Sequence, residues 1–186
     1  MTITIPTVLT LFRIALLPVM AVVFYLPFRG ANIAAALVFI AAAVTDWADG
    51  WIARRFDMGS AFGAFLDPVA DKLMVAVTLF LLVQNNPTPL LAITSAVIVG
   101  REISISALRE WMAEIGQRAT VRVAMIGKIK TTMQMIAIVV LLYQHDLEEL
   151  RLYRVGESLL VIAAILTIWS GMLYVRAAWP ILRRHN

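Results

Sequence analysis

The chain has 186 residues, of which 61% are hydrophobic and only 15% are charged, and its mean hydropathy is +0.85. This composition excludes an ordinary soluble domain, in which about half of the residues are apolar and about a quarter are charged. The absence of cysteine excludes disulfides and thiolate metal sites. The net charge of +4 needs no nucleic acid partner, because basic loops at an anionic lipid surface account for it.

Six apolar stretches follow one another along the chain, and most are close to the about 20 residues that a helix needs to cross a bilayer. They are, approximately, Ile5–Phe28, Ala31–Ala53, Ala64–Val83, Leu90–Trp111, Lys128–Tyr143 and Val155–Ala178. Helices satisfy their own backbone polar groups in lipid, whereas the alternating segments of about ten residues that build a membrane β-barrel are absent. The sequence therefore predicts an all-α, polytopic membrane protein in which residues 1–186 form one domain with six transmembrane helices.

The lysines and arginines in the loops, at the helix ends and at the termini are unevenly distributed between the two sides of the membrane. With six spans, the side of both termini and of the second and fourth loops has Arg54, Arg55, Arg109, Arg118, Arg122, Lys128, Lys130, Arg176, Arg183 and Arg184. The other side has Arg29, Arg151 and Arg154. Because lysine and arginine favour cytoplasmic loops, we expect a multi-pass protein of the cell (inner) membrane with both termini in the cytoplasm.

Four aspartates lie where the second apolar stretch ends and the third begins. Asp46 and Asp49 are three residues apart, and Asp67 and Asp71 are four apart, so each pair lies on one face of its helix. The short connection folds the third helix back beside the second, which lets the two pairs meet across a helical hairpin. A carboxylate at membrane depth is costly and is usually functional or paired. We therefore expect the functional site here, close to one membrane surface.

Clustered carboxylates repel one another, and without cations several of them would have to bind protons. Magnesium and manganese ions prefer oxygen ligands, and two such ions about 3.5–4 Å apart can hold a phosphoryl group during its displacement. The pattern therefore predicts two divalent cations, Mg²⁺ or Mn²⁺, at the four aspartates. Neutralisation by Arg54, Arg55 and Lys72 explains part of the charge, but not two facing pairs at helical spacing.

The residues beside the aspartates are small. Gly50 and Ala53 follow Asp49 by one and four residues, and they leave this face of the helix with almost no side-chain bulk. Gly63, near the start of the third helix, likewise has no side chain. A bulky nucleotide can therefore approach the backbone here, and Arg54 can pair with a phosphate.

From residue 46 to residue 71 the sequence has the form D-x2-D-G-x2-A-R-x8-G-x3-D-x3-D. This stretch resembles the signature of the CDP-alcohol phosphotransferase family and matches it at every fixed position. The segments IPTVLTLFR, LDPVADK, REISISALREWMAE and GKIKTT, at residues 5–13, 66–72, 101–114 and 127–132, are similar to those of the bacterial branch of this family that uses glycerol 3-phosphate. The resemblance covers most of the chain, and Thr7 departs from the asparagine of many relatives.

The resemblance implies a role for each motif residue. Asp46, Asp49, Asp67 and Asp71 would bind two divalent cations, and Asp71 would also be the catalytic general base. The lipid donor CDP-diacylglycerol would be bound by Asp49, Gly50, Ala53, Arg54 and Gly63. Its phosphatidyl group would pass to the hydroxyl of sn-glycerol 3-phosphate, and CMP would leave. Members of the family have six transmembrane helices with a polar cavity open to the cytoplasm, and they commonly form homodimers.

An acceptor that carries a phosphomonoester needs basic side chains near the metals. The candidates for binding glycerol 3-phosphate are Arg101, Arg109, Arg118, Lys128 and Lys130. Arg101 is the most informative, because it lies mid-span, where an unpaired charge is costly. Glu102 and Glu110 can neutralise some of these bases, and the charges alone fit an inositol phosphate equally well.

Three alternative interpretations remain. Within the family, the acceptor could be inositol phosphate, serine or phosphatidylglycerol. A cation transporter or proton relay would also use an aspartate cluster, but it needs a polar path across the bilayer, whereas this cluster lies close to one membrane surface. A non-catalytic scaffold packed through small residues leaves the charge pattern unexplained.

Overall fold

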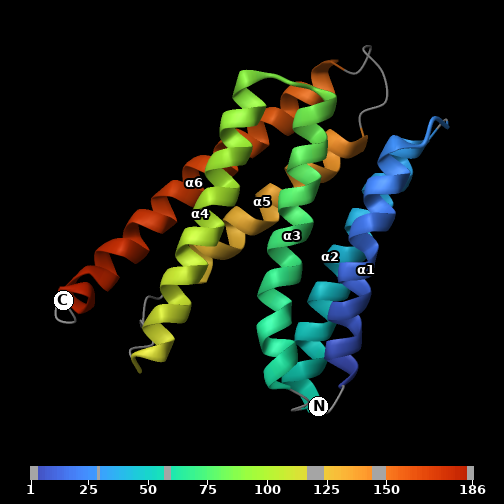
Figure 1. Cartoon of the computed structure of the whole chain (residues 1–186). Coiled ribbons are helices and arrows are strands. Elements are labelled where there is room, and N and C mark those ends of the chain that lie inside the picture. Colours follow the sequence, from blue (N-terminus) through green and yellow to red (C-terminus); the bar gives the residue numbers. More distant parts are fainter. Residues whose placement is uncertain (1–3, 29, 57–59, 117–123, 144–149, 184–186) are drawn as a thin grey trace.

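A computed structural model describes residues 4–28, 30–56, 60–116, 124–143 and 150–183 of the chain. These residues form six α-helices: α1 (Ile5–Tyr25), α2 (Ala31–Phe56), α3 (Ala61–Asn85), α4 (Pro89–Glu114), α5 (Ala124–Tyr143) and α6 (Leu150–Leu182). The helices run up and down beside one another in a single bundle (Figure 1). The all-α fold and the six helices that the sequence predicts are therefore confirmed.

The helix ends explain where the predicted boundaries differ from the structure. α3 begins at Ala61 rather than near Ala64, because the Oγ of Ser60 accepts a hydrogen bond of 3.0 Å from the backbone N–H of Gly63. A serine cap of this kind satisfies one of the free N–H groups of the first helical turn. α6, with 33 residues, extends beyond the predicted apolar stretch at both ends.

The bundle exposes apolar side chains and buries polar ones. Trp47 is 69% exposed and Phe80 63% exposed, whereas Arg13 and Gln134 are only 2% and 1% exposed. Four helices, α1, α2, α4 and α6, are long and apolar enough to cross a membrane. Lipid solvates an apolar exterior and drives polar groups towards the bundle interior. The chain is therefore a multi-pass membrane protein.

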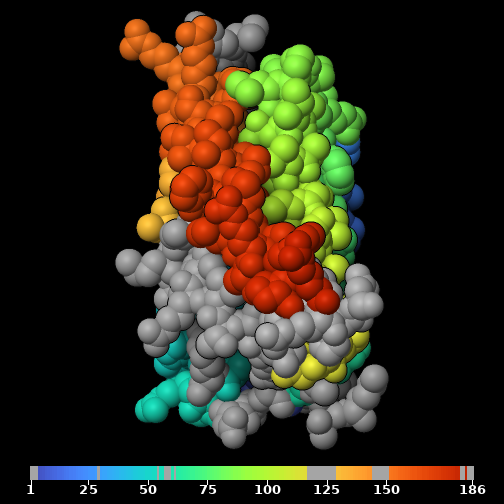
Figure 2. Space-filling model, turned by 90° about the vertical axis from the view of Figure 1, so that its left-hand side faces the viewer, coloured from blue at the N-terminus to red at the C-terminus, as the bar shows by residue number. Residues whose placement is uncertain are grey.

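The contacts between helices determine which side chains reach the aspartates. α1 packs along both α2 and α3, whereas α2 and α3 contact each other only over a short stretch. α5 packs on α2 and, most extensively, on α6, while α4 contacts α3 and α6. Figure 2 shows α6 lying across the face of α4. The expected hairpin of the second and third helices is thus completed by α1, which brings its own side chains between them.

Candidate active site

The carboxylates of the second and third helices come together in the structure. One carboxylate oxygen from each of Asp46, Asp49 and Asp67 lies within 4.8 Å of the other two. Asp46 and Asp49 lie near the end of α2, and Asp67 lies near the start of α3. The two pairs predicted from the helical spacing therefore do meet.

A buried arginine from α1 lies among these carboxylates. Nη1 of Arg13 is 2.9 Å from Asp46 Oδ1, 3.1 Å from Asp67 Oδ1 and 2.5 Å from Asp71 Oδ1. Its Nη2 donates a hydrogen bond to Asp49 Oδ2. Thr10, one helical turn earlier, has its Oγ1 3.5 Å from the same oxygen. One guanidinium therefore contacts all four motif aspartates.

This geometry tests whether the site suits a metal ion. Oxygens of Asp46, Asp67 and Asp71 all lie within 3.1 Å of a single nitrogen of Arg13, so the carboxylates converge on one cationic point. The positively charged guanidinium of Arg13 lies at the position that a metal cation would take. Hard divalent cations such as Mg²⁺ bind carboxylate oxygens of this kind. The residues therefore fit divalent metal binding.

A small cavity of about 130 Å³ lies on one side of the aspartates. The residues that line it are Pro6, Thr7, Thr10, Asp49, Gly50, Ala53, Ser60, Gly63, Ala64 and Asp67. It contains four of the five residues predicted to bind the lipid donor. The fifth, Arg54, lies in α2, and its side chain is outside the described part of the structure.

Gly63 shapes the wall of the small cavity. A Cβ atom at this position would lie 2.9 Å from both Thr7 Oγ1 and Ser60 Oγ. These two hydroxyls are themselves hydrogen-bonded at 2.8 Å and tie the start of α1 to the start of α3. A side chain at Gly63 would therefore displace this polar contact.

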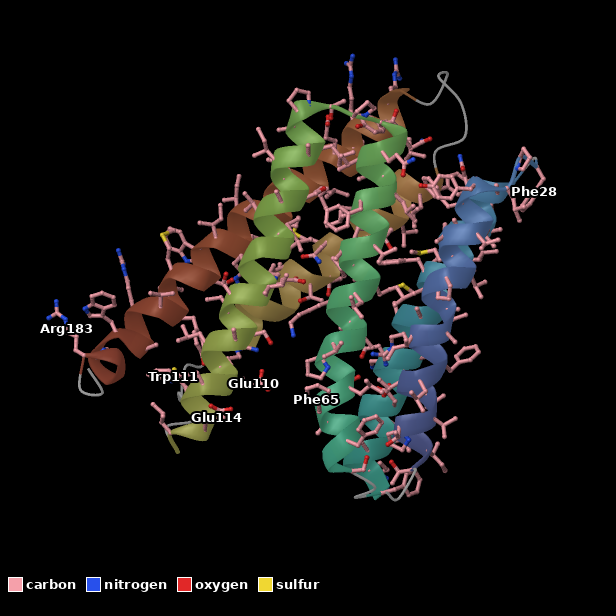
Figure 3. The ribbon with its side chains drawn as sticks, viewed as in Figure 1. Phe28, Phe65, Glu110, Trp111, Glu114 and Arg183 are labelled. Atoms are coloured by element: carbon pink, nitrogen blue, oxygen red, sulfur yellow. The ribbon has the colours of Figure 1, made fainter. Side chains whose placement is uncertain are left out.

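A second, larger cavity of about 560 Å³ lies on the other side of the aspartates, between α3, α4 and α5. Its polar lining includes Asp46, Asp71, Lys72, Arg101, Glu102, Ser106, Arg109, Glu110, Lys130, Thr131 and Gln134. Glu110 of α4 and Phe65 of α3, both labelled in Figure 3, line it from different helices. The family resemblance implies a polar cavity that opens to the cytoplasm.

Three of the five basic residues predicted to bind the acceptor line this larger cavity: Arg101, Arg109 and Lys130. Lys128 lies in α5, two residues before Lys130, but its side chain is outside the described part. Arg118 lies wholly outside the described residues.

Each of these three basic residues of the larger cavity contacts a different neighbour. Lys130 is 6% exposed, and its Nζ is 3.2 Å from Glu102 Oε1. The guanidinium of Arg109 lies over the ring of Tyr174, 5.3 Å from its centroid. Nη2 of Arg101 donates a 2.8 Å hydrogen bond to Ser170 Oγ of α6. Arg101 makes no ion pair with a carboxylate of the described residues, which leaves its charge available to an anion.

The two cavities divide the aspartates between them. Asp49 and Asp67 line the smaller cavity, and Asp46 and Asp71 line the larger one. Each cavity thus receives one carboxylate from α2 and one from α3. Ala64 lines both cavities. The aspartates therefore lie where two ligands, one in each cavity, would meet.

The sequence patterns do not predict two residues of the site, Arg13 and Gln134. Arg13 carried a usable signal, because a single arginine inside an apolar helix is costly in lipid and needs partners. Gln134 is 1% exposed and lines the larger cavity, and its Oε1 has no hydrogen-bond partner among the described residues. A single glutamine in an apolar helix carries a weaker signal, since it is uncharged.

Comparison with known proteins agrees with the motif and the geometry. A model of the CDP-alcohol phosphatidyltransferase family matches residues 3–169. A protein of Sodalis glossinidius is 49% identical over 185 residues, or 100% of each chain. A protein of Pectobacterium atrosepticum is 52% identical over 175 residues, or 94% of each chain. Both relatives are named CDP-diacylglycerol–glycerol-3-phosphate 3-phosphatidyltransferase. Because the match extends over nearly the whole chain and includes every motif aspartate, this chain belongs to the CDP-alcohol phosphatidyltransferase family.

Proposed function

We propose that the protein transfers the phosphatidyl group of CDP-diacylglycerol to sn-glycerol 3-phosphate, which gives phosphatidylglycerophosphate and CMP. The acceptor hydroxyl oxygen forms a bond to the phosphorus next to the diacylglycerol. The bond from that phosphorus to the oxygen bridging to CMP breaks, and the hydroxyl proton passes to the protein. Relatives of this name that match along 94–100% of the chain support the assignment.

The observation that carries the proposal is the division of the aspartates between two cavities. Gly50, Ala53 and Gly63, which have no side chain or only a methyl group, form part of the wall of the smaller cavity. This wall lets a nucleotide diphosphate approach the backbone closely. The larger cavity has Arg101, Arg109 and Lys130 in its wall, which suits an acceptor with a phosphate. The reacting phosphorus would lie between them, at the carboxylates.

Asp71 is the residue we assign as general base. It lines the larger cavity, where the acceptor binds, and it is therefore on the side from which the hydroxyl approaches. Asp49, which lines the smaller cavity and is 3% exposed, is on the side of the donor. A positioned carboxylate that takes a proton in the transition state contributes about 10²–10⁴ in rate.

The four aspartates are also the residues that would hold two divalent cations, with Mg²⁺ as the expected ion. When bound, the cations supply positive charge that offsets the diphosphate and the charge developing on the leaving CMP. Arg13 already places positive charge at this position in the chain itself. It therefore keeps the four carboxylates close together.

We also infer that all six helices span the inner membrane, with both termini and the aspartates towards the cytoplasm. The ends of α2 and α4 and the start of α3 lie at the same end of the bundle (Figure 1). The side of these loops and of the termini has ten of the lysines and arginines named above, and the other side has three. The positive-inside tendency supports this orientation. A homodimer is expected from the family.

An acceptor panel tests the proposed function. The purified protein is incubated with CDP-diacylglycerol, Mg²⁺ and one of glycerol 3-phosphate, inositol phosphate, serine or phosphatidylglycerol, and CMP release is measured. We expect glycerol 3-phosphate to give the highest kcat/KM and a chelator to abolish release. A higher kcat/KM with another acceptor would overturn the assignment but leave the family membership intact.

A further inference from the structure

Arg101 is held from outside the larger cavity by α6. Its Nη2 donates a 2.8 Å hydrogen bond to Ser170 Oγ. Ser170 is 1% exposed, and its own hydroxyl proton points to the backbone oxygen of Thr167 at 3.1 Å. The serine is therefore oriented by its helix, and its lone pair faces the guanidinium.

The next residue of α6 makes room for the same side chain. A Cβ atom at Gly171 would lie 3.1 Å from Arg101 Nε, 3.4 Å from its Cγ and 3.8 Å from its Cδ. A contact of 3.1 Å is too short for an unstrained carbon neighbour, so an alanine here would push Arg101 away. The absence of a side chain at Gly171 therefore determines the path of the arginine, and the hydroxyl of Ser170 determines where its guanidinium stops.

None of the described residues that line the larger cavity belongs to α6. This helix crosses the outer face of α4 (Figure 2), and Arg101 extends from α4 towards it. Ser170 and Gly171 can therefore act on a ligand in the cavity only through Arg101. Lys130, which is buried, is held differently, by Glu102 of α4 itself.

We propose that Ser170 and Gly171 are positioning residues that aim the Arg101 guanidinium at the phosphate of the acceptor. This inference rests on the proposed function, in which that phosphate binds in the larger cavity. Arginine binds phosphate best as a planar fork of N–H groups, so its orientation matters as well as its charge. A guanidinium with one Nη already bonded to Ser170 loses less conformational entropy when it binds the anion.

The proposal predicts a selective defect. In Ser170→Ala, we expect KM for glycerol 3-phosphate to rise about 12- to 160-fold, the range for losing a hydrogen bond to a charged group. KM for CDP-diacylglycerol and kcat should change less than about twofold, since neither depends on acceptor binding. Gly171→Ala should show the same pattern. The matched controls are Ser104→Ala and Gly100→Ala, because Ser104 is exposed and a Cβ at Gly100 would meet nothing within 4 Å.

A double-mutant cycle separates positioning from a merely structural role. If Ser170 acts through Arg101, adding Ser170→Ala to Arg101→Ala should leave KM for glycerol 3-phosphate unchanged. Additive effects, or a parallel rise in both KM values for Ser170→Ala, would overturn the inference. So would an unchanged KM for glycerol 3-phosphate in either Ser170→Ala or Arg101→Ala.

A binding measurement without turnover keeps the two proposals apart. Glycerol 3-phosphate alone should raise the melting temperature of the wild-type protein, and Ser170→Ala should need a higher concentration for half of that shift. If the wild-type protein binds but releases no CMP with this acceptor, the proposed reaction fails while the positioning role stands. If wild type and Ser170→Ala respond to the same concentrations, the positioning role fails instead.

Discussion

Asp49 and Asp71 are bound to the two ends of one guanidinium group, yet they line different cavities. Nη2 of Arg13 bonds Asp49, and Nη1 lies 2.5 Å from Asp71 Oδ1. Asp49 lines the smaller cavity and Asp71 the larger one. Arg13 thus lies between the two cavities, and its charge is shared by carboxylates with different proposed tasks.

Arg13→Met should destabilise the protein most when metal is absent. Arg13 is 2% exposed and contacts all four aspartates, and removing one partner of a buried ion pair costs about 3–5 kcal/mol. In detergent with a chelator, we expect a lower melting temperature than that of the wild type. Added Mg²⁺ should restore much of the difference, because the cation then supplies the missing positive charge.

The control for this measurement is Arg176→Met, which removes an exposed arginine of α6. It should have little effect with or without Mg²⁺. If the Arg13 variant loses the same stability in chelator and in Mg²⁺, then Arg13 and the metals do not share a position.

Asp71→Asn should lower kcat more than it changes either KM. The amide keeps the size of the side chain but cannot take the hydroxyl proton, and loss of a general base lowers the rate about 10²–10⁴-fold. CMP release at saturating donor and acceptor measures this effect. Glu114→Gln, at the exposed end of α4, is the control for loss of a carboxylate. A kcat within a fewfold of the wild type would rule out Asp71 as the base.

Gly63→Ala should weaken binding of the lipid donor. The new Cβ would lie 2.9 Å from Thr7 Oγ1 and Ser60 Oγ, so the hydroxyl pair in the wall of the smaller cavity must move. We expect a raised KM for CDP-diacylglycerol and an unchanged KM for glycerol 3-phosphate, both measured by CMP release. Gly100→Ala is the matched control, since its Cβ would meet nothing within 4 Å. A rise in the acceptor KM alone would contradict the assignment of the two cavities.

Cysteine labelling tests the orientation in the membrane. The native chain has no cysteine, so single cysteines can be placed at Glu114 and Asn85, which lie at opposite ends of the bundle and are exposed. In intact cells, an impermeant maleimide should label Asn85→Cys but not Glu114→Cys. The reverse pattern would place the aspartates on the outer side of the membrane.

Much of the site could be predicted because its residues follow one another closely in the chain. Asp46 and Asp49 share a helix face by spacing alone, and so do Asp67 and Asp71. The structure brings Asp46, Asp49 and Asp67 together, and Asp71 contacts the same guanidinium of Arg13. Gly50 and Gly63 were likewise assigned from the same short stretch, and both line the smaller cavity.

Contacts between residues far apart in the sequence could not be predicted in the same way. Arg13 lies 58 residues from Asp71, and Arg101 lies 69 residues from Ser170. No periodicity in the sequence reveals that α1 fits between α2 and α3, or that α6 crosses α4. These arrangements depend on how helix surfaces pack, which the composition of a single helix does not specify.

The position of Arg13 has a consequence for how the protein is made. The arginine lies in the first helix, and all four of its partners belong to helices that are synthesised later. Insertion of an arginine at the centre of a membrane helix is unfavourable by about 2.5–3.5 kcal/mol. The first helix therefore gains its full stability in the bilayer only once α2 and α3 have emerged from the ribosome. The first three helices should consequently enter the membrane as one cooperative unit, with the future active site as the contact that completes it.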